Sequence, residues 1–258
     1  MEASDQVSQW PQEANAQIAR LQAELAHSRL ALDDFRRTVS HDLRAPLRHI
    51  GAYLQIIRED LGAAADPSLL SHLETARSAA AQLQAMIDGL TELAQLAGAE
   101  LQWADVDLQA LLRQARGQLD AMAPARPLVW QVAPDLPVVR GDAVLLMRLL
   151  TALLDNALKF SRHQPTAAIT VDWTREANGM CGLRIADNGA GFDPRWGGKL
   201  FGVFQRLHSA RDYPGLGLGL AMARGIVERH GGSIRATAAV GQGCAVSLTL
   251  PLAQGAAP

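Results

Sequence analysis

The sequence predicts two folds in series: an α part, a helical hairpin forming a dimeric four-helix bundle, followed by an α+β domain. Apolar residues recur at steps of three and four over residues 12–97, with one short turn between two long stretches. From about Trp103 short alternating runs are mixed with helical patterns, and a hydrophobic content of 48% is enough for a packed core.

Residues 12–61 are expected to form one helix whose apolar pattern changes near residue 40. Up to Val39 the steps alternate between three and four, which is typical of a coiled-coil seam. Leu43 and Leu47 then follow at successive steps of four, a stutter that locally unwinds a supercoil. Pro46 lies in the same stretch and lacks the N–H that would bond to the carbonyl of Asp42. The helix is therefore expected to be most easily bent here.

A turn at residues 62–68, GAAADPS, separates this helix from a second one at residues 69–97. Each helix has only a narrow apolar stripe. The stripe on the first helix is expected to comprise Leu43, Leu47, Ile50 and Leu54. A lone hairpin buries little of such stripes, and pairing two copies buries both, so the pattern favours a homodimer.

The second part of the chain is expected to alternate helices with short strands. In order, the expected elements are a helix at 108–119, extended runs at 127–132 and 138–141, a helix from an Asp142 cap to about Phe160, alternating runs at 168–173 and 180–187 joined through Asn178-Gly179, a helix at 217–230 and a hairpin around Gly241–Gly243. This order indicates a two-layer sandwich with antiparallel pairs in one sheet and helices on one face.

Composition excludes several classes of protein. A formal net charge of −2 argues against a nucleic-acid-binding surface. Cys181 and Cys244 are far apart and fit neither a disulfide framework nor a zinc site. The N-terminus lacks the apolar run of a signal peptide, and Arg148 and Asp155 interrupt the longest apolar stretch, so no membrane span is expected. These features predict a cytoplasmic protein.

His41 carries the strongest hint of chemistry in the helical part. At about 100° per residue it lies roughly 200° from Leu43 around the helix, on the solvent side. A lone surface histidine is usually solvated and without a role. Here, however, Asp42 can accept a hydrogen bond from one ring nitrogen and leave the other as a nucleophile. The helix is also expected to bend most easily next to His41, at the stutter and Pro46. Together these features favour a functional histidine.

Polar residues on otherwise apolar faces indicate a nucleotide site in the second part. Asn156 falls on the apolar stripe of the helix that starts at Asp142, and Lys159 can reach a phosphate one turn on. An asparagine tilted toward solvent is the alternative. Asp187 ends an alternating run on its inward face, and Gly189 and Gly191 would let a flat ring approach the backbone.

Gly215, Gly217 and Gly219 open a predicted helix, where converging backbone N–H groups favour an anion. The segment is not a P-loop, because no Gly-Lys-Ser/Thr follows. It is also a poor match to a dinucleotide-binding fingerprint, because no ribose-binding acid follows an early strand.

In this order, the stretches resemble the sequence boxes of sensor histidine kinases of two-component systems. FRRTVSHDLRAPLRHI is similar to the H-box, LLDNALKF to the N-box, DNGAGF to the G1 box, KLFGVFQRLH to the F-box and PGLGLGL to the G2 box. The resemblance covers roughly residues 30–252, and the segment RLHSARDYPGLGLGL is most similar to phytochrome-type kinases. It implies a coiled-coil signalling helix at 1–34, a dimerisation and histidine phosphotransfer domain at 35–100, a catalytic ATP-binding domain of the histidine kinase/heat-shock ATPase type at 101–252, and a frayed tail at 253–258.

The resemblance also implies an enzyme, a protein histidine kinase that uses ATP and Mg²⁺. It would phosphorylate His41 and pass the phosphoryl group to an aspartate on the receiver domain of a response regulator. Helical spacing places Arg48, Ala52 and Gln55 on the same side of the helix as His41, so we expect the receiver domain to dock there. An upstream sensor domain or protein would supply the signal. The implied roles are phosphorylated residue for His41, general base for Asp42, hinge for Pro46, Mg²⁺ ligand for Asn156, and ATP binding for Asn156, Lys159, Asp187, Gly189, Gly191, Arg206, Gly215, Gly217 and Gly219. Phe201 and Phe204 would pack the lid over ATP or simply join the core.

Two positions depart from the family pattern. Ala45 stands where the family usually has Thr or Asn to position a water, so the resemblance does not extend to phosphatase activity. Ala152 stands where a second Asn is common, so metal affinity is lower or water substitutes. These departures suggest one alternative, a non-catalytic dimeric adaptor with a degenerate nucleotide site. A second alternative is an ATPase of the related superfamily, which would share the N-box and the glycine boxes but have no use for the H-box.

Overall fold

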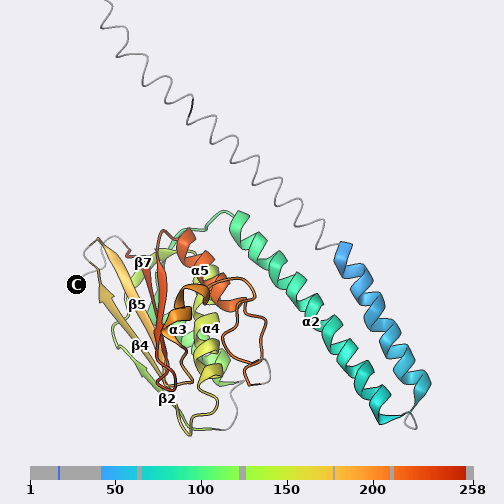
Figure 1. Ribbon diagram of the computed structural model, residues 1–258. Helices are drawn as coiled ribbons and strands as arrows, with labels where there is room; N and C mark the ends of the chain where they lie inside the picture. Colours follow the sequence, from blue (N-terminus) through green and yellow to red (C-terminus); the bar gives the residue numbers. More distant parts are fainter. Residues whose placement is uncertain are drawn as a thin grey trace, which may run out of the picture. The chain divides into compact units, whose positions relative to one another are not determined.

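The computed structural model describes residues 17, 42–62, 66–121, 126–176, 178–209 and 212–253 (Figure 1). The chain divides into two compact units, Met1–Ala94 and Gln95–Pro258, and each is described by itself. His41, and all of the expected coiled-coil segment except Gln17, lie outside the described residues.

The first unit contains the predicted helical hairpin. Residues 42–61 are helical, and α2 (Pro67–Gly98) follows after a turn. Gly62 has a φ of 63°, a backbone conformation that glycine adopts without strain. The Asp66 carboxylate accepts a hydrogen bond from Ser68 N at 2.7 Å, which satisfies one of the unpaired donors at the start of α2.

Within one chain the hairpin buries only half of its apolar seam. Leu47 and Leu54 are half-buried on the first helix, and Ala80 and Ile87 are buried on α2. The other half is exposed: Leu43, Ile50 and Ile57 at steps of seven on the first helix, and Leu69, Leu83 and Leu90 at steps of fourteen and seven on α2, with exposed Ala76 at the position between the first two. The expected stripe is thus split into an inner edge facing the hairpin partner and an outer edge facing outward.

A polar contact also fixes the two hairpin helices against each other. Arg44 Nε donates to Asp88 Oδ1 at 2.8 Å, and Arg44 Nη2 donates to Thr91 Oγ1 at 3.2 Å. Pro46 lies two residues further on, inside continuous helix. Whether the helix bends beside His41, as the sequence predicts, concerns residues outside the described range.

The second unit is a five-stranded sheet with helices on one face. Its strand order is β2-β4-β5-β7-β6, and Figure 1 shows α3, α4 and α5 together on one side of it. The strands are β2 (Leu128–Val132), β4 (Ala167–Arg175), β5 (Met180–Asp187), β6 (Ile234–Ala238) and β7 (Cys244–Pro251). The helices are α3 (Leu108–Asp120), α4 (Ala143–Phe160) and α5 (Gly219–Arg229), and a 3₁₀ helix, η1 (Pro194–Lys199), precedes the glycine-rich segment.

Two features of this unit differ from the sequence expectation. β2 pairs with β4 in parallel, so the sheet is mixed and not purely antiparallel. The chain between these two strands includes α4, and such a crossover returns the next strand in the same direction. A separate antiparallel pair, β1 (Ala104–Asp107) with β3 (Val138–Gly141), was also not expected, because β1 contains one buried apolar residue, Val106.

α4 forms the centre of the core. Its buried face comprises Leu145, Leu146, Leu149, Leu150, Leu153, Leu154 and Ala157, all at or below 9% exposure. They pack with the inward residues of the sheet and with α3 and α5 into one cluster. Within the described residues no helix is long and apolar enough to cross a bilayer.

Asp142 fixes the point at which α4 begins. Its carboxylate accepts from the backbone N of Val144 and Leu145 at 3.0 and 3.1 Å, and from Gln102 N at 3.0 Å. Its own backbone N–H donates to Nε2 of the buried His230 at 3.0 Å, whose Nδ1 bonds to Ile226 O at 2.7 Å. Since a carbonyl can only accept, His230 is protonated on Nδ1. The start of α4 is therefore tied to the end of α5.

We expect Asp142→Ala to lower the free energy of unfolding of the protein by about 1–2 kcal/mol, because the α4 cap and the hydrogen bond from Gln102 N are lost together. Urea unfolding followed by circular dichroism measures this. Asp105→Ala is the matched control, since it removes an exposed ion pair with Arg140 at 3.2 Å and should cost less than about 0.5 kcal/mol. Equal losses in the two variants would contradict the capping role.

Candidate nucleotide-binding site

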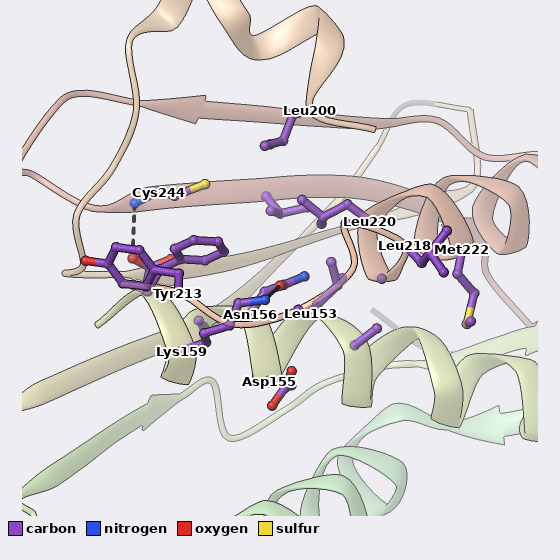
Figure 2. Close-up of a pocket in the computed structure, with 18 of the residues that line it drawn as sticks. Leu153, Asp155, Asn156, Lys159, Leu200, Tyr213, Leu218, Leu220, Met222 and Cys244 are labelled. Atoms are coloured by element: carbon purple, nitrogen blue, oxygen red, sulfur yellow. Dashed lines mark hydrogen bonds between the residues drawn. The ribbon is translucent and has the colours of Figure 1, made fainter. Parts of the chain in front are cut away.

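The predicted nucleotide residues converge on one cavity of about 720 Å³ between α4, α5, the glycine-rich segment and the ends of β5 and β7. Its volume is in the range of pockets that hold small ligands and cofactors. Of the residues predicted to bind ATP, all except Gly189 line it: Asn156, Lys159, Asp187, Gly191, Arg206, Gly215, Gly217 and Gly219. In Figure 2, Tyr213 and Cys244 lie toward one end of the cavity and Leu218 and Met222 toward the other.

Asp187 provides a hydrogen-bond acceptor at the ends of the strands. One of its carboxylate oxygens accepts from Gly189 N at 2.8 Å and from Cys244 N at 3.3 Å; the dashed line in Figure 2 marks the bond from Cys244. Burial raises the pKa of the carboxyl from 3.8 to about 6, although both backbone bonds lower it. A half-buried acid of this kind is suited to an N–H donor on a ligand, which would compensate the desolvated charge.

Cys244 lies opposite Asp187 in the β5–β7 ladder and lines the same cavity. Burial, together with the neighbouring Asp187 carboxylate, raises the pKa of its thiol to about 12. The sulfur therefore stays protonated at neutral pH and acts as an apolar part of the wall rather than as a nucleophile.

Lys159 and Arg206 make another part of the cavity cationic. Burial lowers the pKa of Lys159, Asp155 raises it, and the charge on Arg206 lowers it further. Lys159 Nζ donates to Asn156 Oδ1 at 2.9 Å, and Arg206 Nη2 donates to the carbonyl of Tyr213 at 2.7 Å. Two neighbouring cations suit a group with more than one negative charge, such as a polyphosphate.

Two glycines are required by close backbone approach. Gly191 has a φ of 59°, and a Cβ there would lie 2.0 Å from the carbonyl oxygen of Ala239. Gly217 has a φ of 73°, and its Cβ would lie 2.6 Å from the carbonyl oxygen of Gln205. Any other residue at either position would move the backbone that lines the cavity.

An aromatic cluster beside Lys159 was not predicted from the sequence. Ring centroids lie 5.0 Å apart for Phe160 and Tyr213, 5.1 Å for His208 and Tyr213, and 5.4 Å for His163 and Tyr213. His163 and His208 are far apart in the chain, and only the fold brings them together with Tyr213. Tyr213, at the start of the glycine-rich segment, was the available signal.

The two F-box phenylalanines have different surroundings. Phe201 is 7% exposed and belongs to the hydrophobic core. Phe204 contacts the glycine-rich segment, since its backbone N donates to Gly217 O at 3.1 Å. Its φ of 60° is strained for a residue other than glycine.

The phosphoacceptor region is described only from Asp42 onward. Asp42 and Pro46 are exposed on the first helix of the hairpin, and Ala45 between them is half-buried. His41 lies outside the described residues, so its role stays a prediction from the sequence.

The residues present fit a magnesium ion that travels with a nucleotide. Asn156 Oδ1 is a suitable oxygen ligand, and Ala152 offers none. Among the described residues no group of three or more His, Cys, Asp or Glu could hold a metal by itself. Mg²⁺ typically takes one or two protein ligands and completes its shell with phosphate and water oxygens, which such a site allows.

Comparison with known families agrees with this division of the chain. Residues 31–98 match the family described as His Kinase A (phospho-acceptor) domain. Residues 141–254 match the family described as Histidine kinase-, DNA gyrase B-, and HSP90-like ATPase. An ATPase of the related superfamily would not need a phospho-acceptor domain, so the first match argues against that alternative. The two domains occur in the order predicted from the sequence boxes.

The chain belongs to the sensor histidine kinases.

Relatives of this histidine kinase include phytochrome-like proteins. Phytochrome-like protein Cph1 of Synechocystis sp. is 27% identical over 92% of this chain and 31% of its own length. The methanogenesis regulatory histidine kinase FilI of Methanothrix harundinacea is 31% identical over 85% of this chain and 24% of its own length. The crystal structure of full-length ShkA in complex with AMPPNP matches with a TM-score of 0.62 at 25% identity, over 87% of this chain and 47% of that one. The chain thus spans about a third or less of these curated relatives.

Asp187→Asn should make the nucleotide-free histidine kinase more stable above pH 6. The native carboxyl, with its pKa raised to about 6 from 3.8, binds a proton more tightly than the unfolded chain does. The contribution of Asp187 to the free energy of unfolding of the wild type is therefore fully present below about pH 4. It declines by up to about 3 kcal/mol as the pH rises to about 6. Urea unfolding across pH 4–8 should show this decline in the wild type only. A decline of equal size in Asp187→Asn would show that another group titrates.

Proposed function

We propose that this chain catalyses ATP-dependent autophosphorylation of His41 and then donates the phosphoryl group to an aspartate on a response-regulator receiver domain. The observation that carries this proposal is the polarity of the cavity. It combines a half-buried acceptor at Asp187 with neighbouring cations at Lys159 and Arg206, and so complements an amino-bearing base and a phosphate chain. The phospho-acceptor family match over residues 31–98 supplies the second half of the reaction.

Each residue has a defined task toward ATP. Asp187 accepts the adenine amino group, and Gly191, which lines the cavity, lets the ring lie against the backbone. Gly189 acts through its backbone N–H, which holds the Asp187 carboxylate. Lys159 leaves the oxygen of Asn156 and pairs with a phosphate, which frees that oxygen to hold Mg²⁺. Mg²⁺ would neutralise charge on the phosphates.

Gly215, Gly217 and Gly219 surround the phosphates as α5 begins. Figure 2 shows Asn156 and Lys159 on α4, with Leu218 and Leu220 at the start of α5 across the cavity. Arg206 adds a second cation and is held by its bond to the Tyr213 carbonyl. Backbone N–H groups at a helix start favour an anion, so this side of the cavity is suited to the triphosphate.

The chemistry at His41 is a phosphoryl transfer. A ring nitrogen of His41 attacks the γ-phosphorus, a P–N bond forms, and the P–O bond to the leaving ADP breaks. Asp42 takes the proton from the other ring nitrogen. Catalysis of this kind depends chiefly on positioning and charge stabilisation. Pro46 acts as the hinge that lets a signal move the two halves of the helix.

The exposed edge of the hairpin supports a homodimer. Leu43, Ile50 and Ile57 repeat every seven residues on the first helix, and the exposed leucines of α2 fall on the same period, with Ala76 at one position. An apolar seam of this period is buried when two hairpins form a four-helix bundle. The opposite face carries Arg48, Ala52 and Gln55, all exposed, and is the surface that we assign to the receiver domain.

The proposal also includes an upstream sensor domain or protein that supplies the signal, and a cytoplasmic location for this chain.

A non-catalytic adaptor is the second candidate function, because Ala45 and Ala152 replace polar residues of the family pattern. Ala152 lines the cavity, so its effect on Mg²⁺ and ATP affinity can be measured directly.

Incubating the full chain with γ-labelled ATP and Mg²⁺ should place acid-labile, alkali-stable label on His41, and His41→Gln should lose it. Asp187→Asn should reduce labelling at least tenfold, since its amide would oppose the adenine amino group with a donor. Label retained in His41→Gln would assign the phosphoryl acceptor elsewhere. ATP binding without labelling would favour the adaptor.

Ile50→Lys should weaken the dimer by more than tenfold, because it places a charge in the apolar seam. Analytical ultracentrifugation over a concentration series measures this. Gln55→Lys introduces the same side chain on the opposite face and should leave the dimer intact. Dimerisation unaffected by Ile50→Lys would mean that another surface forms the dimer.

A further inference from the structure

We propose that His208 is a positioning residue that fastens the glycine-rich segment, residues 213–219, to the fixed part of the nucleotide site. This inference rests on the proposed ATP binding and extends it to a residue outside the assigned nucleotide-binding set. His208 would act on the phosphate side of the site by holding the segment and Arg206 in place.

The imidazole of His208 is tied to the turn that follows Asp187. Its Nε2 lies 2.8 Å from the carbonyl oxygen of Gly191. Because a carbonyl can only accept, Nε2 carries the proton and donates it to this bond. Gly191 is a fixed anchor, since its backbone packs against the carbonyl of Ala239 with no room for a Cβ.

The same ring also packs against two further aromatic rings. The His208 ring centroid lies 5.4 Å from that of Phe160, the last residue of α4, and 5.1 Å from that of Tyr213, the first residue of the segment, and both pairs are tilted. His208 therefore connects three parts: the turn beyond Asp187, the end of α4 and the start of the segment.

The residues just before His208 are bonded to the segment itself. Phe204 N donates to Gly217 O at 3.1 Å, and Arg206 Nη2 donates to Tyr213 O at 2.7 Å. Residues 204–206 and the glycine-rich segment thus hold each other, and His208 joins this pair to Gly191 and Phe160. The strained φ of 60° at Phe204 indicates that the arrangement is enforced by its surroundings.

The base side of the site has supports that do not involve His208. The turn beyond Asp187 is fixed by Ala190 N donating to Phe160 O at 3.0 Å and by Gly241 N donating to Ala190 O at 2.7 Å. Asp187 is held by the backbone N–H groups of Gly189 and Cys244. Removing the His208 ring should therefore loosen the phosphate side and leave the adenine side in place.

The test compares ATP with adenosine on the full chain. For His208→Ala we expect the Kd of Mg·ATP, measured by calorimetry, to rise about tenfold, and that of adenosine, measured by NMR titration, to rise less than about twofold. His208→Gln keeps a donor close to Nε2, and His208→Phe keeps the ring, so each should restore part of the ATP affinity. A thermal unfolding scan without nucleotide accompanies each variant.

Two results would overturn the inference. Either equal losses for ATP and adenosine or unchanged ATP affinity in His208→Ala would show that His208 does not position the phosphate side. Wild-type protein that binds no ATP would instead refute the proposed function, and this inference with it. Asp187→Asn separates the cases, because it should weaken both ligands alike.

Discussion

The fixed start of α4 is the constraint on which the rest of the nucleotide site depends. A helix turns by about 100° per residue, so the residue at which α4 begins decides which side chains face the sheet and which face the cavity. Asp142 sets that residue by capping the first turn, and its backbone bond to His230 sets the distance to α5. With the start fixed, the leucines of α4 face the core, and Asn156 and Lys159 reach the cavity.

Asp142 both stabilises the fold and positions the site, whereas Asp187 lowers the stability of the fold at the place where a ligand is proposed to bind. Burying an ionised carboxyl is unfavourable, and the two backbone N–H groups that face it offset only part of that cost, as its raised pKa shows. A bound amino group would supply the missing donor. Asp187 therefore lowers the stability of the fold relative to a neutral residue, and the binding of an amino group would recover the difference.

The sequence was sufficient wherever a local rule decided the outcome. The cap at Asp142, the inward placement of Asp187 and the cavity position of Asn156 follow from capping and from periods of two and 3.6 residues. The parallel pairing of β2 with β4 could not be predicted in this way, because it depends on how a whole helix crosses the sheet. The cluster of Phe160, His163, His208 and Tyr213 was also hidden, since its members approach one another only when the segment before α5 folds back on the end of α4.

The hairpin shows why pattern alone could not divide its apolar stripe. A period of seven marks Leu43, Leu47, Ile50 and Leu54 equally, yet one chain covers only Leu47 and Leu54. The distinction comes from the partner helix, because α2 lies over one edge of the seam, where Arg44 reaches Asp88 and Thr91. The uncovered edge then needs a second apolar surface, and an identical hairpin provides one of matching period. In the proposed dimer, the exposed face that bears Arg48 and Gln55 stays outside the bundle core.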